Sequence, residues 1–160
     1  MPVIQVIRPI KKLPKNRDAA RRAICRDVIA HLNTKKLIAE TGTYGDVVDD
    51  ARCQACALGS MFVTLTGSRE LVCVDDDDMR GRLAPYFTRA ELLDIETAFE
   101  GAVVTSCGDD PEAATRYRSG IGGNDEADTN LRYIMANIIR NGRFEPLDHR
   151  GPRAIRPFRS

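Results

Sequence analysis

The 160-residue sequence has no tryptophan, only two histidines and few aromatic residues, 6% of the total. It also has no run that approaches the ~18 consecutive apolar residues of a membrane-spanning helix. The N-terminus lacks the apolar stretch and the cleavage site of a secretory signal peptide. Because these features are missing, we expect a cytoplasmic protein without a membrane partner.

The cysteines do not form the even set that small secreted domains use for disulfides. There are five, at positions 25, 53, 56, 73 and 107, and we expect reduced thiols. Cys53 and Cys56 have the spacing of a zinc or redox pair, but zinc needs two further ligands and no second close pair follows. Redox chemistry expects such a pair in a βαβ unit, which is not predicted here. We interpret both as buried structural residues and expect no cofactor, with zinc as the alternative.

No residue pattern points to catalysis. His31 lies near the end of a predicted helix, where a partial positive charge suits the helix dipole. His149 lies in a basic tail, and neither histidine has a nucleophile beside it. We therefore expect a protein that is not an enzyme and has no catalytic residues.

An acidic run occupies the middle of the chain and consists of Asp75, Asp76, Asp77 and Asp78. Carboxylates could hold a hard cation, but a calcium loop that starts at Asp76 would place Arg80 and Phe87 at positions that need oxygen ligands. A magnesium site with distant carboxylates is an alternative. We favour a helix cap for residues 79–83, and we expect the run to form a partner-binding surface.

Charge is strongly segregated although the net charge is only +1. Residues 1–26 carry eight basic residues and one acidic residue, and residues 140–160 carry six and two. The intervening residues 27–139 carry ten basic and twenty acidic residues. Two basic ends therefore flank an acidic middle.

The apolar pattern predicts a mainly α protein, a compact bundle of about five or six helices with extended basic N- and C-terminal arms. We expect an arm over residues 1–16, a helical domain over 17–142 and a tail over 143–160. Apolar residues recur at helical spacing in several segments. The predicted helices cover residues 17–32, 34–40, 51–65, 88–100, 110–117 and 125–140.

Capping signals set several of these boundaries. Asn16 is the expected N-cap of the first helix, and Asp49 and Asp50 are the expected caps of helix 51–65. Thr88 and Glu91 form a capping box. Glycines at positions 67, 101 and 142 are the expected helix ends. For residues 69–74 a brief strand and a turn of helix remain open.

The basic arms suit a phosphate backbone. The candidate nucleic-acid-binding residues are Lys11, Lys12, Lys15, Arg153 and Arg156. Aromatic residues that could stack on bases are sparse among them, and the acidic middle would repel a duplex. The arms could equally dock on protein.

Three blocks of sequence together resemble a group of small proteins encoded by tailed bacteriophages and prophages. They are residues 53–62, 83–101 and 131–142. The resemblance implies a phage setting inside a bacterial host cell and assigns no site residues. In that setting, small non-enzymatic proteins serve as inhibitors of host systems, as sponges for signalling nucleotides or as particle components.

These observations lead to one main functional hypothesis and two alternatives. We expect a small intracellular binding protein, a phage accessory or counter-defence factor that binds a host protein through the acidic run. The first alternative is a phage structural or assembly component whose arms dock on neighbouring subunits of a homo-oligomer. The second alternative is a protein that binds nucleic acid or a signalling nucleotide with its arms.

Overall fold

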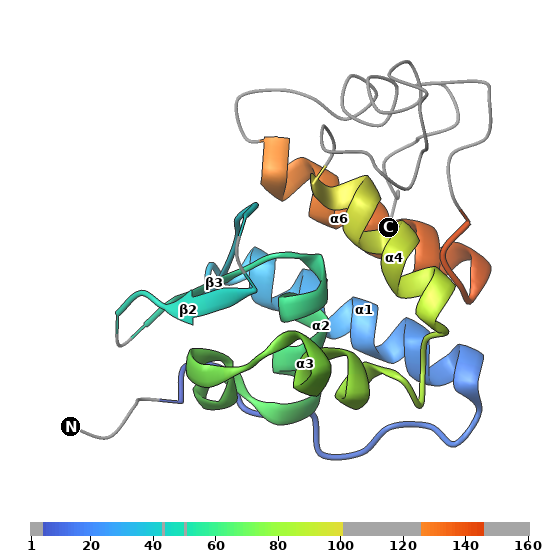
Figure 1. The fold of residues 1–160 in the computed structure, drawn as a ribbon, viewed down its shortest axis with the longest axis horizontal. Coiled ribbons are helices and arrows are strands. Elements are labelled where there is room, and N and C mark those ends of the chain that lie inside the picture. Colours follow the sequence, from blue (N-terminus) through green and yellow to red (C-terminus); the bar gives the residue numbers. More distant parts are fainter. Residues whose placement is uncertain (1–4, 43, 50, 101–125, 146–160) are drawn as a thin grey trace.

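The computed structural model describes residues 5–42, 44–49, 51–100 and 126–145 (Figure 1). The described residues form five α-helices, one 3-10 helix and a small three-stranded sheet. In chain order the elements are α1 (Arg17–Asn33), β1 (Leu37–Ala39), β2 (Gly45–Val47), β3 (Cys53–Ala55), α2 (Ala57–Thr66), the 3-10 helix η1 (Ser68–Cys73), α3 (Asp76–Leu83), α4 (Arg89–Glu100) and α6 (Glu126–Asn141). The mainly helical prediction is confirmed, whereas the sheet was not predicted.

The three long helices begin and end close to where the sequence predicts. The Asn16 side chain caps α1 by accepting a hydrogen bond from the Ala19 amide, at 2.9 Å. At α4, the Thr88 hydroxyl accepts from the Glu91 amide at 3.1 Å and the Glu91 carboxylate accepts from the Thr88 amide at 3.5 Å, which confirms the predicted capping box. At the end of α6, Gly142 has a φ of +76° and its amide donates to the carbonyl oxygen of Ile138.

The predicted helix over residues 34–40 is wrong, and the predicted helix over 51–65 is wrong at its start, because residues of both segments form the sheet. Residues 34–40 were expected to be helical, but Lys35 takes a φ of +62° after α1 and the chain continues into β1. The strand has alternating burial, with Leu37 buried and Ile38 exposed, which is the period of a strand. Within the expected helix 51–65, Cys53 and Ala55 alternate with the less buried Gln54 in β3.

The cap of α2 is therefore different from the predicted one. Cys56 is the N-cap of α2, and its Sγ accepts a hydrogen bond from the Gly59 amide at 3.4 Å. Asp49 instead lies in the β2–β3 turn, where its carboxylate accepts from the Ala51 amide and pairs with Arg52 at 2.8 Å. Asp50 lies outside the described residues. The Gly67 prediction is confirmed, because that residue ends α2 with a φ of +89°.

The sheet has the order β1-β3-β2, with β1 parallel and β2 antiparallel to the central β3. Cys53 pairs with Leu37 on one side and with Val47 on the other. Helix α2 follows β3 directly and is buried from Ala57 to Thr64. It packs on α1, α3, α4 and η1, so it is the centre of the core.

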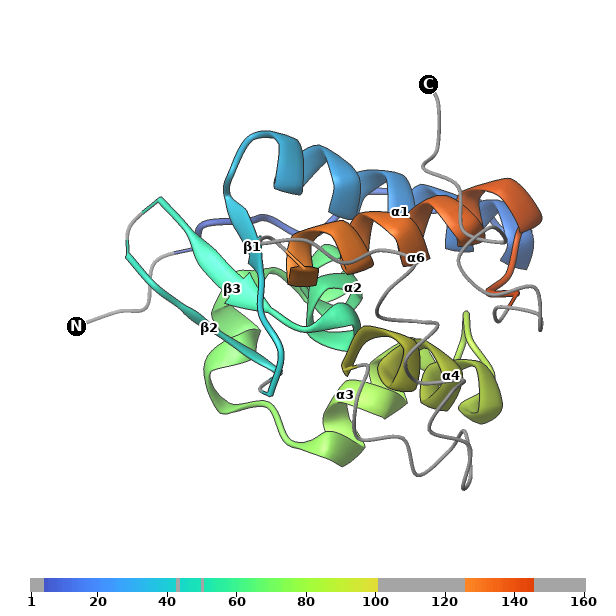
Figure 2. The same ribbon diagram turned by 90° about the horizontal axis from the view of Figure 1, so that it is seen from above.

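Helices α1 and α6 lie side by side in opposite directions across this centre (Figure 2). No helix among the described residues is both long enough and apolar enough to cross a bilayer. The predicted helix over 110–117 and the predicted helix end at residue 101 lie outside the described residues.

The N-terminal segment, residues 5–16, contains no helix or strand but is attached to the domain. The amides of Val6 and Ile7 donate to the Ser68 hydroxyl at 2.9 and 3.0 Å, and the Ser68 amide donates back to the carbonyl of Ile7. Ile7 is buried, and the Ile10 amide donates to the carbonyl of Thr64 at 2.8 Å. This part of the expected arm is therefore held along α2 and η1.

Arg21 of α1 is a buried arginine that joins segments far apart in the sequence. Its side chain is 7% exposed. The guanidinium donates to the carbonyl oxygens of Tyr86 at 2.6 Å and Gly142 at 3.0 Å, and it pairs with Asp18 at 2.9 Å. It also lies 3.4 Å from the Glu91 carboxylate. One side chain thus links α1, the α3–α4 loop, α4 and the end of α6.

We predict that Arg21→Met lowers the free energy of unfolding by about 2–4 kcal/mol. The change leaves a buried carbonyl and a largely buried carboxylate with fewer donors. Arg17→Met is the matched control, because Arg17 also donates to the Tyr86 carbonyl but is exposed, and it should cost less than about 1 kcal/mol. Urea denaturation measures both, and equal losses would contradict the role of Arg21.

Gly59 allows the turn between β1 and β2 to approach α2 closely. A Cβ at this position would overlap the backbone carbonyl of Tyr44. The same carbonyl accepts a hydrogen bond from the Cys56 amide at 3.3 Å. By contrast, a Cβ at Gly81 of α3 would meet no atom within 4 Å.

We predict that Gly59→Ala and Gly81→Ala change stability in opposite directions. Gly59→Ala should destabilise the protein by at least about 2 kcal/mol, since backbone must move to make room. Gly81→Ala should stabilise it by up to about 1 kcal/mol, because alanine is the better helix former. Thermal and urea unfolding of the two variants test this, and a well-folded Gly59→Ala protein of normal stability would refute the close packing.

Candidate functional site

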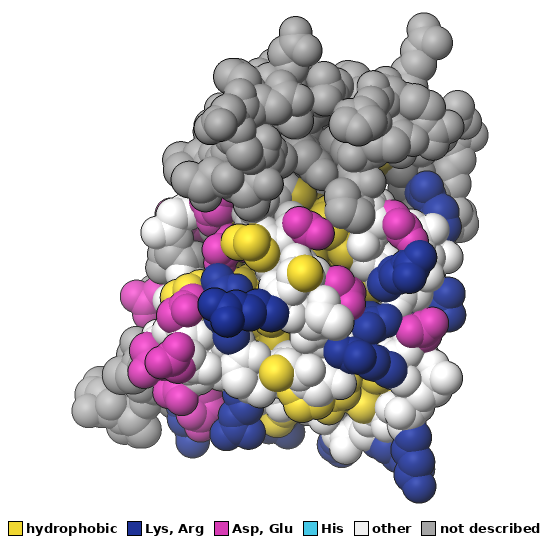
Figure 3. Space-filling model, turned by 45° about the vertical axis from the view of Figure 1, so that its right-hand side comes forward, with side chains coloured by type: hydrophobic (Ala, Val, Ile, Leu, Met, Phe, Trp, Pro, Cys, Tyr) yellow, Lys and Arg dark blue, Asp and Glu magenta, His cyan; other side chains and the backbone are white. Residues whose placement is uncertain are grey.

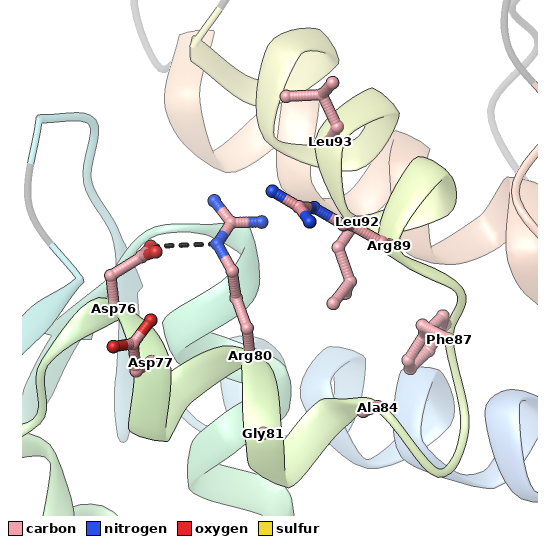
Figure 4. A pocket seen from close by; sticks show the side chains of 9 residues that line it. All are labelled: Asp76, Asp77, Arg80, Gly81, Ala84, Phe87, Arg89, Leu92 and Leu93. Carbon is pink, nitrogen blue, oxygen red and sulfur yellow. Dashed lines mark hydrogen bonds and ion pairs between the residues drawn. The ribbon is translucent and has the colours of Figure 1, made fainter.

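A surface hollow lies between α3 and α4 and is the candidate functional site (Figure 4). Its volume is about 590 Å³. Apolar and small residues line it together with charged residues of both signs. The lining residues are Asp76, Asp77, Arg80, Gly81, Ala84, Phe87, Arg89, Leu92 and Leu93. We call it the α3–α4 hollow.

The acidic run lies at the start of α3, and the fold uses half of it. Asp75 is the N-cap of α3, and its carboxylate accepts from the Asp78 amide at 2.8 Å. Asp76 accepts hydrogen bonds from the Tyr44 hydroxyl and from Arg80 Nε. The carboxylates of Asp77 and Asp78 are exposed and bond to no other residue in the described part of the chain. The expected helix cap is confirmed, and Asp77 and Asp78 remain available to a partner.

The two arginines of the hollow differ in their partners. Arg80 lies between two carboxylates, 2.9 Å from Asp76 and 3.0 Å from Glu96 of α4. The Arg89 guanidinium lies beside that of Arg80 at the mouth of the hollow (Figure 4). Arg89 is exposed and makes no hydrogen bond to another described residue. The charge of Arg80 is therefore balanced by two ion pairs, whereas Arg89 acts on Asp76 only through space and forms no ion pair with a described residue.

The turn between β1 and β2 rests on both helices of the hollow. The Tyr44 hydroxyl reaches Asp76 of α3, and the Gly42 amide donates to the Glu100 carboxylate of α4 at 3.1 Å. Burial and the bond to Asp76 raise the pKa of Tyr44 to about 12. The Tyr44 bond, followed by that from Arg80, lowers the pKa of Asp76. Burial raises the pKa of Glu100.

Apolar side chains form the floor of the hollow. Phe87 and Leu92 are 1% and 2% exposed, so they belong to the core and also close the hollow from below. Leu93 is 45% exposed and is one of the few large apolar side chains on the described surface. Figure 3 shows apolar and charged side chains of both signs close together on one face of the molecule. The arrangement can hold an apolar group between a carboxylate and a guanidinium.

The cysteines lie where the sequence analysis expects, in the core. Cys25, Cys53 and Cys56 are buried free thiols. Burial raises the pKa of Cys53 and of Cys56 to about 11, and it also raises the pKa of Cys25. Within the described ranges no group of three or more His, Cys, Asp or Glu side chains is placed to hold a metal ion. Cys107 and the side chain of Cys73 lie outside what the structure describes.

The other predicted residues are dispersed. His31 lies in the last turn of α1, where its Nδ1 is 3.3 Å from the Asp27 carboxylate. Lys11, Lys12 and Lys15 are exposed on the N-terminal segment and are not among the residues that line the hollow. His149, Arg153 and Arg156 lie outside the described residues.

Sequence reasoning missed the second wall of the hollow. Arg89 and Leu93 are four residues apart on α4, so they share one face of that helix. Leu92 and Leu93 are adjacent, and only Leu92 is buried. The signal that could have located the site is Leu93, an apolar residue that lies outside the buried face of the helix and four residues after Arg89.

We predict that Cys53 and Cys56 react slowly with thiol reagents in the folded protein. At pH 8 a thiol with a pKa of about 11 is ionised in roughly one molecule in a thousand. Labelling should accelerate as the pH rises toward 11 and when urea unfolds the chain. Maleimide labelling followed by peptide mass spectrometry measures each cysteine. Rapid labelling of the folded protein at pH 8, or stoichiometric bound zinc, would contradict the structural role.

Comparisons with known proteins give no relative from which a role could be transferred. No protein-family model matches the chain, and neither a curated protein nor a solved structure matches it significantly.

Proposed function

We propose that this chain is a non-enzymatic binding protein that takes a segment of a protein partner in the α3–α4 hollow. The observation that supports this proposal is the set of charges that the fold leaves unused around an apolar floor. Asp77 and Arg89 line the hollow, and neither bonds to another described residue. Leu93, which also lines the hollow, exposes an apolar side chain on α4.

The chemistry of the hollow favours a polypeptide partner. Protein interfaces combine an apolar centre with a polar rim and are enriched in arginine. An apolar side chain of the partner would enter the hollow over Phe87 and Leu92, which are already desolvated. A cationic side chain beside it would meet Asp77, and a carboxylate would meet Arg89. The expected partner segment therefore carries an apolar residue flanked by opposite charges.

The setting that we propose is a bacterial cell infected by a phage. The resemblance to small phage-encoded proteins supports a counter-defence or accessory role, in which the chain occupies a host protein. To occupy a host protein, the chain needs affinity and a complementary surface, and it needs no catalytic residues. A hollow with unused charges and an exposed leucine meets that requirement.

The proposal predicts that Arg89→Glu and Leu93→Asp each weaken partner capture at least ten-fold. The few hot-spot residues of an interface cost about 2 kcal/mol or more when they are truncated, and the proposal places Arg89 and Leu93 among them. Both residues are exposed, so the fold should tolerate the changes. The experiment is a pull-down from bacterial lysate with quantitative mass spectrometry.

Val48→Asp is the matched control, because Val48 is an equally exposed apolar residue, 47% against 45%, in the β2–β3 turn. A photo-crosslinking residue at position 93 should label the captured protein, and the same residue at position 48 should not. Undiminished capture by Arg89→Glu and Leu93→Asp, or equal crosslinking from both positions, would refute the proposed site.

A further inference from the structure

The N-terminal segment carries a row of cations that no acidic residue in the described part of the chain neutralises. Arg8, Lys11, Lys12 and Lys15 are exposed, and they form no ion pair or hydrogen bond with another described residue. The sequence contains no acidic residue before Asp18. We call these four residues the basic strip. Figure 3 shows Lys and Arg side chains along the lower edge of the molecule, the edge that the N-terminal segment follows in Figure 1.

The basic strip is displayed from a fixed backbone. On one side of it, Ile7 is buried and its amide and carbonyl both bond to Ser68. Within it, Ile10 bonds to the Thr64 carbonyl and Leu13 packs against the core. A preorganised row of charges binds a ligand with a smaller loss of chain entropy than a free arm would.

The spacing of the strip suits a repeating anion. Pro9 and Pro14 keep the segment from becoming a helix, so the cations follow one another along a non-helical chain. The four residue steps from Lys11 to Lys15 span at most about 14 Å when the chain is extended. A strand of duplex DNA presents one phosphate about every 3.4 Å along the helix axis. Several phosphates therefore lie within reach of the strip.

The side chains of the segment distinguish among nucleic acids. Single-strand binders stack bases on aromatic residues, and residues 5–17 contain none. Duplex RNA is recognised mostly by its shape and by contacts to its 2′-hydroxyls and phosphates, and the uncharged polar side chains of residues 5–17 that could contact a 2′-hydroxyl are those of Gln5 and Asn16. The Gln5 side chain accepts from the Arg69 amide, and that of Asn16 caps α1. The polar side chains of residues 5–15 that bond to no other described residue are all cations, and cations bind the phosphates of duplex DNA.

We propose that the basic strip is a docking surface for the phosphate backbone of double-stranded DNA, bound without sequence preference. This surface is distinct from the α3–α4 hollow and does not depend on the function proposed for it. The acidic middle of the chain repels DNA elsewhere, so contact is confined to this edge. The binding is weak and strongly dependent on salt.

The test is fluorescence anisotropy of a labelled 20-base-pair DNA duplex with the full chain, at salt concentrations from about 50 to 200 mM. The strip variant is Lys11→Gln/Lys12→Gln/Lys15→Gln. The control variant is Arg26→Gln/Lys35→Gln/Lys36→Gln, which removes the same charge from exposed residues of α1 and the following turn. Circular dichroism confirms that both variants fold.

We expect the control to bind like the unchanged chain and the strip variant to bind at least ten-fold more weakly at 50 mM salt. The slope of log affinity against log salt should be less steep by about 2.7 in the strip variant, because three phosphate contacts are lost. A second duplex of unrelated sequence should bind equally well.

Four results would overturn the proposal. They are the absence of DNA binding at 50 mM salt, equal losses in the two variants, binding to duplex RNA as tight as to DNA, and competition by polyglutamate as effective as that by unlabelled DNA at equal charge. The last result would identify an acidic protein as the partner of the strip.

Discussion

The buried guanidinium of Arg21 is the interaction on which the arrangement of the helices depends. It donates to the backbone carbonyls of Tyr86, in the α3–α4 loop, and of Gly142, after the end of α6. Its Cζ atom also lies 6.0 Å from the centre of the Phe87 ring. A buried cation must satisfy its donors within the protein, so these carbonyls have to lie where Arg21 can reach them. The α3–α4 loop is thereby fixed on α1, and this loop forms one end of the α3–α4 hollow. Phe87 belongs to this loop, so its buried ring is part of the core and also forms the floor of the hollow.

The long helices could be predicted from the sequence because their signals are local and repeated. In α1 the buried residues Ala20, Ile24, Val28 and Leu32 recur at four-residue intervals after a polar cap. The strands are three residues long, which is too short for alternation to be recognised. Their formation depends on pairing between residues 37–39 and 53–55, a contact that no local pattern encodes. Leu37, Cys53 and Ala55 therefore fit a helical pattern equally well.

For a similar reason, only the α3 wall of the candidate site could be predicted from the sequence. Asp76 and Asp77 were recognised because they belong to an unbroken acidic run. The opposing wall comes from α4. Its position beside α3 is a tertiary contact, which no local sequence pattern encodes. Sequence alone also could not separate the aspartates by role, because the use of Asp76 is set by Tyr44, 32 residues away. The α3–α4 hollow and the basic strip both present charged side chains that pair with no other described residue.

The contact between Tyr44 and Asp76 has a consequence for how occupancy of the α3–α4 hollow could be observed. A ligand cation that attracts the Asp76 carboxylate competes with the phenol for it, and the environment of the ring then changes. The chain has no tryptophan to mask the emission of its four tyrosines. Tyr44 is thus an intrinsic optical reporter at the rim, one that needs no attached dye.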